Sequence, residues 1–406
     1  MRRLPKVAAQ PHSQPPFQAA FAAAPPPPAS YIMRVFSPTL PAMSDSAYAA
    51  QLAEKTARLD ALLSPLGAPP LEVFDSPAAH YRMRAEFRIW HEGEKLHYAM
   101  FRPGGKGGRE SLLLIEQFEA ASLAINALMP RLLAAVSAVP VLKNRLYQCE
   151  FLSASTGEVL LTLIYHKKLD DEWRCAAEDL QRELGVSLIG RSRGQKIVLS
   201  QDFVTEKLDV MGNGFQYRQY EGAFTQPNAR VCEKMLAWAC TQAQGVDGDL
   251  LELYCGNGNF TLPLARYFRR ALATELSKTS VAAAQWNIEA NGANNIAVAR
   301  LSAEEFAEAF AGSRRFRRLA EKGIDLADYR FSTLFVDPPR AGLDEATLAL
   351  AAQFERVIYV SCNPETLRAN LERLSASHSI AAAALFDQFP FTPHIESGVL
   401  LVKKAA

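Results

Sequence analysis

The stretch LLELYCGNGNF, residues 250–260, decides the fold. Its apolar start predicts a strand, and Gly256 and Gly258 follow in a loop that runs into a helix. Glycines let the backbone approach a ligand closely, and a helix N-terminus offers free N–H groups. Glu275 ends the next predicted strand, where an acid can accept hydrogen bonds from both hydroxyls of a ribose. This pairing predicts a nucleoside-containing cofactor at the first turn of an α/β sheet.

The segment around this stretch alternates between strands and helices from about residue 223 to the end. That rhythm is typical of a Rossmann-like, mostly parallel sheet with helices on both faces. Two further strands are predicted at the end of the chain, joined by a loop. The other predicted strands are ALATEL (271–276), IAVARL (296–301), TLFVDPP (333–339) and RVIYVSCN (356–363). We therefore assign residues 223–406 to a cofactor-binding catalytic domain.

The preceding part, residues 44–222, reads as a separate α+β domain. It opens with an amphipathic helix and continues into HYRMRAEFRIWH, residues 80–91. Alternation along this strand places Arg82, Arg84 and Arg88 on one face and apolar residues on the other. A half-buried strand with a basic outer face is the result, and RNA is the expected partner of this domain.

Positive charge gathers near this strand although the whole chain has a formal net charge of only +1. Further basic residues lie in two places: Arg102, Lys106 and Arg109, and then Arg191, Arg193 and Lys196. Aromatic surfaces on which unstacked bases could stack are expected at Tyr81, Trp90 and Tyr147. The alternative reading of the basic strand is a solvated face with no ligand.

Composition excludes several other classes. The 406 residues include six cysteines, none in a C-x-x-C pair, so zinc ribbons have no support and a reducing cytoplasm fits best. There is no apolar run of about 18 residues, so no membrane span is expected. Residues 1–43 are rich in Pro and Ala and are expected to be a disordered tail. Translation from Met43, just before the first helix, is the alternative.

The loop after the first strand favours S-adenosylmethionine over a nicotinamide cofactor. It lacks the third glycine of G-x-G-x-x-G, and an acid, Glu252, stands inside the strand. The fourth strand ends in Asp337-Pro338-Pro339-Arg340, an acid-Pro-Pro tract typical of methyltransferases that act on bases. Two prolines stiffen that loop and aim backbone carbonyls into the site.

The fifth strand delivers Cys362 to the edge of the sheet where ligands bind. Asn363 and Pro364 stop the strand there, and a helix N-terminus is expected to lower the pKa of the thiol. A thiolate suits methylation of a poor carbon nucleophile such as carbon 5 of uracil, because its addition to carbon 6 moves electron density to carbon 5. A separate base must then remove the carbon 5 proton. Glu396, in the loop before the last strand, is preferred over His394 for that role.

These motifs resemble those of one family both in their sequences and in their order along the chain. The runs QYEGAFTQPN, LLELYCGNGNF, FVDPPRAGL, YVSCNPETL and ALFDQFPFTPHIESGVLL are similar to bacterial tRNA (uracil-5-)-methyltransferases of the TrmA type. HYRMRAEFRIWH and LIYHKKLDDEW in the first domain resemble the same family. The resemblance covers about residues 45–404.

The resemblance implies a class I S-adenosylmethionine-dependent methyltransferase with Cys362 as nucleophile and Glu396 as proton acceptor. Cofactor contacts would come from Gln226, Tyr254, Asn259, Glu275 and Asp337. RNA contacts are expected from Arg82, Arg84, Arg88 and Tyr147. No metal and no iron–sulfur cluster are expected. The implied substrate is uridine 54 in the T-loop of tRNA, with the matching loop of transfer-messenger RNA (tmRNA) as a second candidate. We expect a cytoplasmic monomer.

Other functions stay open at this point. A ribosomal-RNA uracil-5 methyltransferase is the main alternative, but such enzymes usually carry a cysteine-ligated cluster that this N-terminal half lacks. A small-molecule or protein methyltransferase would need neither Cys362 nor a basic first domain. A non-enzymatic RNA chaperone that binds the T-arm is the third alternative.

Overall fold

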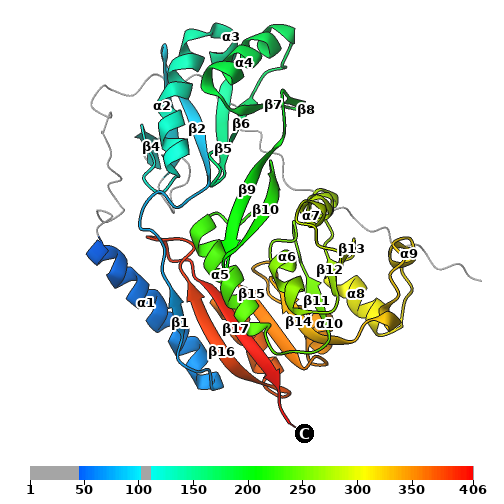
Figure 1. The fold of residues 1–406 in the computed structure, drawn as a ribbon. Helices are drawn as coiled ribbons and strands as arrows, with labels where there is room; N and C mark the ends of the chain where they lie inside the picture. The colour runs from blue at the N-terminus through cyan, green and yellow to red at the C-terminus, as the bar shows by residue number, and fades with distance from the viewer. Residues whose placement is uncertain (1–44, 102–110, 406) are drawn as a thin grey trace, which may run out of the picture. The chain divides into compact units, whose positions relative to one another are not determined.

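The computed structural model of the chain describes residues 45–101 and 111–405 (Figure 1). The Pro/Ala segment 1–43 and the basic residues Arg102, Lys106 and Arg109 lie outside the described residues, so the expectations on them stay predictions. The described strands form one eight-stranded sheet, one seven-stranded sheet and a two-stranded hairpin.

The eight-stranded sheet confirms the expected parallel arrangement. Its order is β1-β16-β17-β15-β14-β11-β12-β13, and only β17 runs antiparallel to its neighbours. The strands are β1 (Glu72–Phe74), β11 (Asp249–Leu253), β12 (Ala271–Thr274), β13 (Ile296–Ala299), β14 (Phe331–Val336), β15 (Arg356–Ser361), β16 (His378–Phe386) and β17 (Glu396–Lys403).

Helices cover both faces of this sheet because successive strand residues point to opposite sides. Leu251 packs in a core with α1, α8, α10 and α11, whereas Leu250 packs in another core with α5 and α6. The helices of this part are α1 (Asp45–Leu63), α5 (Ala229–Gln242), α6 (Thr261–Leu264), α7 (Lys278–Ala290), α8 (Ala303–Phe310), α9 (Arg317–Ala320), α10 (Glu345–Ala351) and α11 (Pro364–Leu374). Short 3-10 turns are η2 (Ser64–Leu66), η4 (Ala265–Tyr267) and η5 (Leu326–Asp328).

The first helix and strand, α1 and β1, pack on the eight-stranded sheet, which the sequence did not suggest. Residues 45–74 were grouped with the first domain, yet β1 pairs in parallel with β16, with Glu72 opposite Ala384. Figure 1 shows α1 and β1, in blue, beside the C-terminal strands. The pairing partner lies far away in sequence, so no local pattern signals it. The division at residue 222 stays a prediction.

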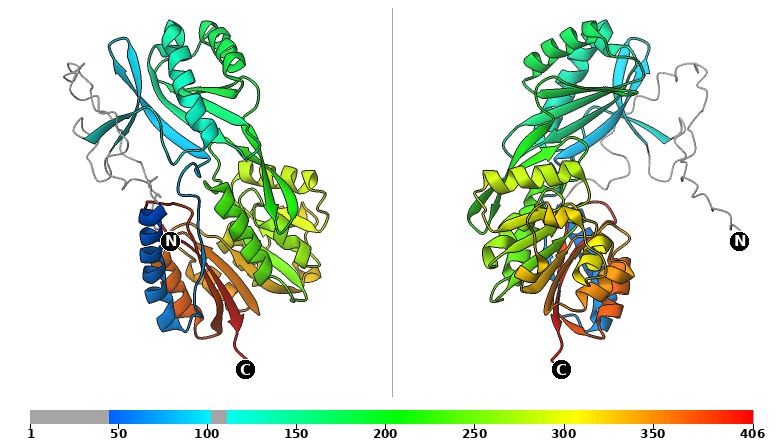
Figure 2. Two further views of the ribbon diagram at one scale, coloured as in Figure 1. Left: turned by 60° about the vertical axis from the view of Figure 1, so that its left-hand side comes forward. Right: turned by 90° about the vertical axis from the view of Figure 1, so that its right-hand side faces the viewer.

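The seven-stranded sheet has the order β4-β3-β2-β5-β6-β7-β8 and is antiparallel except between β6 and β7. Helices α2 (Leu123–Ala138) and α4 (Asp171–Leu184) pack against one of its faces (Figure 2), and α3 (Pro140–Lys143) follows α2. The strands are β2 (Arg84–Glu92), β3 (Lys95–Phe101), β4 (Leu112–Ile115), β5 (Leu146–Ser153), β6 (Val159–Tyr165), β7 (Ser187–Ser192) and β8 (Gln195–Val198).

A hairpin of β9 (Phe203–Val210) and β10 (Asn213–Tyr220) leads from this sheet towards α5. Its β10 strand is fixed to α7 by two asparagines: Asn287 accepts from the Arg218 N–H, and Asn291 accepts from the Gln216 N–H. Asn287 also donates to the Asn257 carbonyl in the glycine loop, at 2.8 Å. The hairpin is therefore held against the predicted cofactor loop.

Candidate active site

Three neighbouring strands end at the same level. Leu253 of β11 is opposite Thr274 of β12 and Val336 of β14. The next residues along the three strands are Tyr254, Glu275 and Asp337, so parallel register alone brings these predicted residues to one edge.

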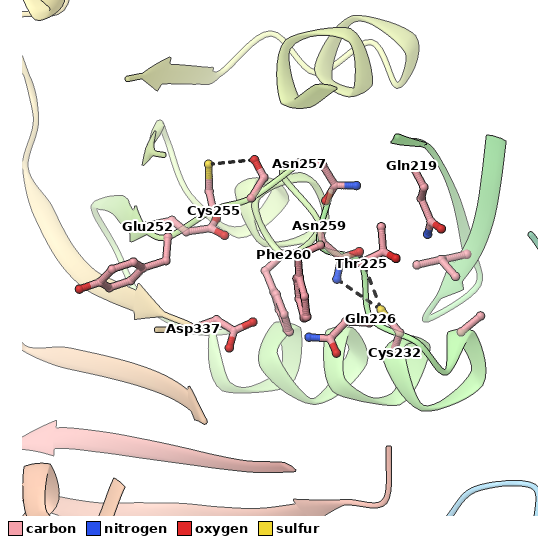
Figure 3. A pocket seen from close by; sticks show the side chains of 15 residues that line it. Gln219, Thr225, Gln226, Cys232, Glu252, Cys255, Asn257, Asn259, Phe260 and Asp337 are labelled. Atoms are coloured by element: carbon pink, nitrogen blue, oxygen red, sulfur yellow. Dashed lines mark hydrogen bonds between the residues drawn. The ribbon is translucent and has the colours of Figure 1, made fainter. Parts of the chain in front are cut away.

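A pocket opens at this edge. It is lined by four of the five predicted cofactor residues: Gln226, Tyr254, Asn259 and Asp337. Figure 3 shows Asp337 coming from the end of β14, while Gln226 comes from the segment before α5.

Glu275 is not among the lining residues, and its carboxylate has local partners. It accepts hydrogen bonds from the Gly256 N–H at 3.1 Å and the Ser277 N–H at 2.7 Å. These bonds fix the carboxylate beside the glycine loop, and each carboxylate oxygen keeps a further lone pair. The role expected for Glu275 stays a prediction.

The glycine loop has an unusual backbone. Tyr254 adopts a φ of 62°, which is rare for a residue with a Cβ, and Gly256 and Gly258 also have positive φ values. Asn259 donates to the Cys232 sulfur at 3.3 Å, and its carbonyl accepts from the Tyr217 hydroxyl. Strained backbone held this firmly is typical of ligand sites.

Two buried acids face the pocket. Burial raises the pKa of Glu252 to about 8, although the Thr261 hydroxyl lowers it. Burial also raises the pKa of Asp337 to about 7. Acids with such pKa values in a pocket often mark a functional site, here one that would favour a bound cation.

The predicted nucleophile and base meet through strand register. Ser361 of β15 is opposite Ser397 of β17, and the Ser397 hydroxyl donates to the Ser361 carbonyl at 3.0 Å. Because these two strands are antiparallel, Cys362 and Glu396 come next to each other beyond that pair. Glu396 is the first residue of β17 rather than part of the preceding loop, and it is buried.

The thiol pKa differs from expectation. Burial raises the pKa of Cys362, and so do Glu396 and Asp337, while Arg340 lowers it. The expected lowering at the start of α11 is therefore wrong. The main reason is burial of the thiol, and the carboxyl groups of Asp337 and Glu396, which come from other strands, raise its pKa further.

The pKa of Glu396 lies well above that of an ordinary glutamate. Burial raises it first and Asp337 raises it further, while Arg340 lowers it. The rival His394 is exposed and accepts a hydrogen bond at Nδ1 from Arg340 at 3.2 Å. His394 lies two residues before Glu396 and is outside the paired part of β17, whereas Glu396 is next to the Ser361–Ser397 pair. The geometry therefore favours Glu396 as the partner of Cys362.

The arginines of the basic strand differ in their surroundings. Arg88 lies over the Tyr147 ring at 4.0 Å, and the His166 ring stacks on Tyr147 at 3.9 Å. Arg84 is more buried, and burial lowers its pKa while Glu150 and other acids raise it.

The neighbouring Arg82 donates to the Arg84 carbonyl and approaches the Phe389 ring. Tyr81 was expected to offer a stacking surface, but it is buried and donates to the Pro390 carbonyl at 3.1 Å. That expectation is wrong. The roles of the arginines and Tyr147 in RNA binding stay predictions.

The second basic group is largely neutralised within the chain. Arg191 forms two hydrogen bonds with Glu221, at 2.5 and 2.6 Å, and Lys196 pairs with Asp202 at 2.9 Å. Arg193 is exposed. Ion pairs of this kind weaken the case for Arg191 and Lys196 as phosphate contacts.

Sequence reasoning missed some residues of the site. Gln219 on β10, Cys232 on α5 and Thr225 line the pocket together with the expected residues. His166 lies in the LIYHKKLDDEW motif, whose sequence does not indicate that its ring stacks on Tyr147. The alternating pattern of residues 203–220 could have revealed the hairpin that carries Gln219.

The residues that the structure describes bear on metal binding and on membrane insertion. No group of three or more His, Cys, Asp or Glu side chains there could hold a metal ion. None of the helices in residues 45–101 and 111–405 is long and apolar enough to cross a membrane.

Known proteins resemble the chain over nearly its whole length. The tRNA (uracil-5-)-methyltransferase family matches residues 47–404. A tRNA/tmRNA (uracil-C(5))-methyltransferase of Neisseria meningitidis is 63% identical over 362 residues, which are 89% of this chain and 98% of that protein. A relative of the same name from Acinetobacter baylyi is 55% identical over 354 residues, 87% of this chain and 98% of that protein.

A solved structure shares the fold. The Pyrococcus abyssi tRNA (uracil-54, C5)-methyltransferase, crystallised with S-adenosyl-L-homocysteine, superposes with a TM-score of 0.66 at 20% identity, covering 87% of this chain and 83% of that one. The likeness confirms the predicted methyltransferase fold, and the family match confirms the resemblance drawn from the motifs. The chain belongs to the tRNA (uracil-5-)-methyltransferase family.

Proposed function

We propose that the chain transfers a methyl group from S-adenosylmethionine to carbon 5 of uridine 54 in the T-loop of tRNA, and of the equivalent uridine in tmRNA. The observation that carries the proposal is the register of β15 and β17, which brings Cys362 and Glu396 together at the edge that Asp337 also reaches. The relatives named for tRNA and tmRNA support this substrate over ribosomal RNA.

The residues of the pocket fit S-adenosylmethionine. Glu252 and Asp337 are acids that suit a cationic ligand, and Glu275 is fixed beside the glycine loop with lone pairs left for hydroxyl donors. Gln226 and Asn259 add amide groups. When bound, the cofactor supplies an electrophilic methyl group on a sulfonium. Its positive charge would lower the pKa of neighbouring acids.

The protein's own part in the reaction has two stages. After its proton has left to solvent, the Cys362 thiolate adds to carbon 6 of the uracil, and the carbon 5–carbon 6 electron pair moves toward carbon 5, which takes the methyl group. Glu396 then accepts the carbon 5 proton, the carbon 5–carbon 6 double bond re-forms, and the bond to sulfur breaks. The burial of Glu396 supports this assignment, since a raised pKa makes a carboxylate a stronger base.

RNA recognition is proposed for the face of the seven-stranded sheet that α2 and α4 leave open. Arg84 and Arg88 of β2, with Arg82 just before that strand, would contact phosphates, and Tyr147 would stack on an unpaired base. In the structure the Tyr147 ring already has Arg88 and His166 against it. One of those neighbours must therefore move before a base can take its place.

Oligomeric state and location complete the proposal. We propose a cytoplasmic monomer. The location is supported by all six cysteines being free thiols, as in reducing compartments. Light scattering of the purified chain, alone and with tRNA, tests the monomer. Fractionation of cells tests the location, and a dimer mass or a membrane-bound pool would overturn each part.

The central test uses 5-fluorouridine. tRNA carrying 5-fluorouridine at position 54 should form a covalent complex in the presence of S-adenosylmethionine, because fluorine cannot leave as a proton and elimination stops. Cys175→Ala, at an exposed cysteine, should form it normally, and Cys362→Ala should not. A catalytically active protein that gives no complex contradicts the covalent mechanism. Methylation of tRNA with cytidine at position 54 contradicts the substrate.

A further inference from the structure

The segment that delivers Glu396 is a loop with an unusual conformation. Residues 387–395, here called the Glu396 loop, connect β16 to β17 without regular structure. Phe391 within it has a φ of 59°, which is strained for a residue with a Cβ. Such a loop keeps one conformation only if its surroundings determine it.

Helix α1 supplies much of that support, through three polar residues on one stripe. Gln51, Lys55 and Arg58 are spaced by four and three residues, so they share a face of the helix. The Gln51 side chain accepts from the Phe391 N–H at 2.6 Å, and the Arg58 guanidinium donates to the Pro393 carbonyl at 3.3 Å.

Lys55 lies at the centre of this stripe. Its ammonium donates to the Phe389 carbonyl at 2.9 Å and pairs with the Asp387 carboxylate at 2.7 Å. The side chains of Lys55 and Asp387 are 4% and 0% exposed, so water screens the pair very little. Burial lowers the pKa of Lys55, and the Asp387 charge raises it.

A buried ion pair at such a place stabilises little by itself. The cost of desolvating two charges offsets most of their attraction. A pair of apolar residues of similar size often stabilises the fold just as much. The pair instead fixes positions, because an ammonium and a carboxylate hold each other in one geometry. Here Lys55 fixes the Asp387 carboxylate and the Phe389 carbonyl at the start of the Glu396 loop.

The position of Asp387 is coupled to that of Glu396 by the sheet. Phe386 of β16 is opposite Glu396 of β17, so the two ends of the loop lie side by side. The Asp387 N–H also donates to the Phe74 carbonyl of β1 at 3.0 Å. A displacement of Asp387 therefore reaches Glu396 through one hydrogen-bonded strand pair.

We propose that Lys55 and Asp387 are positioning residues that hold the Glu396 carboxylate in place for removal of the carbon 5 proton. The inference rests on the proposed function. Neither residue touches the RNA base in this scheme: they act through Glu396. In the affected step the carbon 5–hydrogen bond breaks, the proton goes to Glu396, its electron pair forms the carbon 5–carbon 6 double bond, and the carbon 6–sulfur bond breaks to release the Cys362 thiolate.

The test isolates that step. Asp387→Asn and Lys55→Met should lower kcat about tenfold or more, as for a misplaced catalytic group. They should also accumulate a methylated covalent complex on a denaturing gel and enlarge the kinetic isotope effect with 5-deuterouridine tRNA. The KM for tRNA should stay within about twofold, because no RNA contact is removed. Glu54→Gln, at an exposed neighbour on α1, is the matched control and should behave as wild type.

A single variant leaves one charge buried without its partner and can unfold. The double variant Lys55→Met/Asp387→Asn removes both charges and keeps the fold testable by thermal melting. If this folded protein turns over with the isotope effect and complex level of wild type, the inference is overturned. If wild type itself forms no complex with 5-fluorouridine tRNA, the proposed function fails instead, so the two failures are distinct.

Discussion

The catalytic edge of the eight-stranded sheet and the open face of the seven-stranded sheet are organised in different ways. At the edge, buried strands place Tyr254, Asp337, Cys362 and Glu396 through register, so backbone pairing determines their neighbours. On the open face, the arginines of β2 have partly exposed side chains, such as Arg88 over the Tyr147 ring, and no strand register fixes the ends of these side chains. The proposed chemistry therefore depends on positions that the backbone fixes, whereas the proposed RNA contacts depend on surface charge.

The largest expected effect comes from the two residues joined by register. Cys362→Ala should lose at least about a thousandfold in turnover and form no covalent complex, since the addition to carbon 6 has no substitute. Glu396→Gln keeps size and hydrogen bonding but cannot accept the proton. It should stall as a methylated complex that retains labelled methyl on a denaturing gel.

Turnover alone would make these two variants look alike, so the gel is the informative measurement. A Glu396→Gln protein that turns over near the wild-type rate would assign the base to another group. His394 is then the first to replace, because it lies in the loop that leads into Glu396.

The next effect concerns the acid beside the glycine loop. Glu275→Ala should weaken S-adenosylmethionine binding by about 1–3 kcal/mol, because ribose hydroxyls and the N–H groups of Gly256 and Ser277 lose their acceptor. Glu275→Gln keeps one acceptor oxygen and should lose less. Calorimetric titration measures both, with Glu289→Ala on an exposed part of α7 as control. Equal affinity in all four proteins would refute the ribose assignment.

These residues also show how far the sequence alone leads. The strands around Gly256, Asp337 and Cys362 were predictable because each carries an apolar run with a motif at its end. Four of the five predicted cofactor residues line the pocket. Tyr254, Asn259 and Asp337 come from motifs that follow parallel strands, whose ends converge, and Gln226 comes from the segment before α5.

Features that depend on distant residues were not predictable. The three-residue β1 pairs with β16, more than 300 positions away, and its own sequence has no strand signature. The pKa of Cys362 was wrongly predicted for the same reason, because burial of the thiol and the approach of Asp337 and Glu396 both come from other parts of the fold. Lys55 likewise has the sequence pattern of an ordinary charge on an amphipathic helix, and only the fold brings Asp387 to it.

A smaller effect is expected from Arg340, which lowers the pKa of both Cys362 and Glu396. Both groups act deprotonated, and both have raised pKa values, so activity should rise with pH until those pKa values are passed. Arg340→Gln removes the lowering charge and should move this rise to higher pH. At a fixed pH below the rise, a pKa higher by one costs about tenfold in rate. Profiles of kcat/KM against pH test this, with Arg368→Gln on α11 as control. An unchanged profile would show that Arg340 does not act on these groups.

The smallest expected effect separates two arginines of the open face. Arg88 lies on the Tyr147 ring with Glu86 as its nearby acid, whereas Arg84 is surrounded by Glu150, Glu221 and Glu86. A guanidinium already balanced by carboxylates releases fewer counterions when RNA binds. Arg88→Ala should therefore weaken tRNA binding a few-fold and reduce the slope of log affinity against log salt by about 0.7–0.9.

Arg84→Ala should change that slope less, so it serves as the matched comparison on the same strand. Filter binding or anisotropy at several salt concentrations measures both slopes. If the two variants and wild type share one slope, this face is solvated and does not bind phosphates. If Arg84→Ala has the larger effect, its carboxylate neighbours must separate from it on binding, and the open face rearranges more than the structure of the free chain suggests.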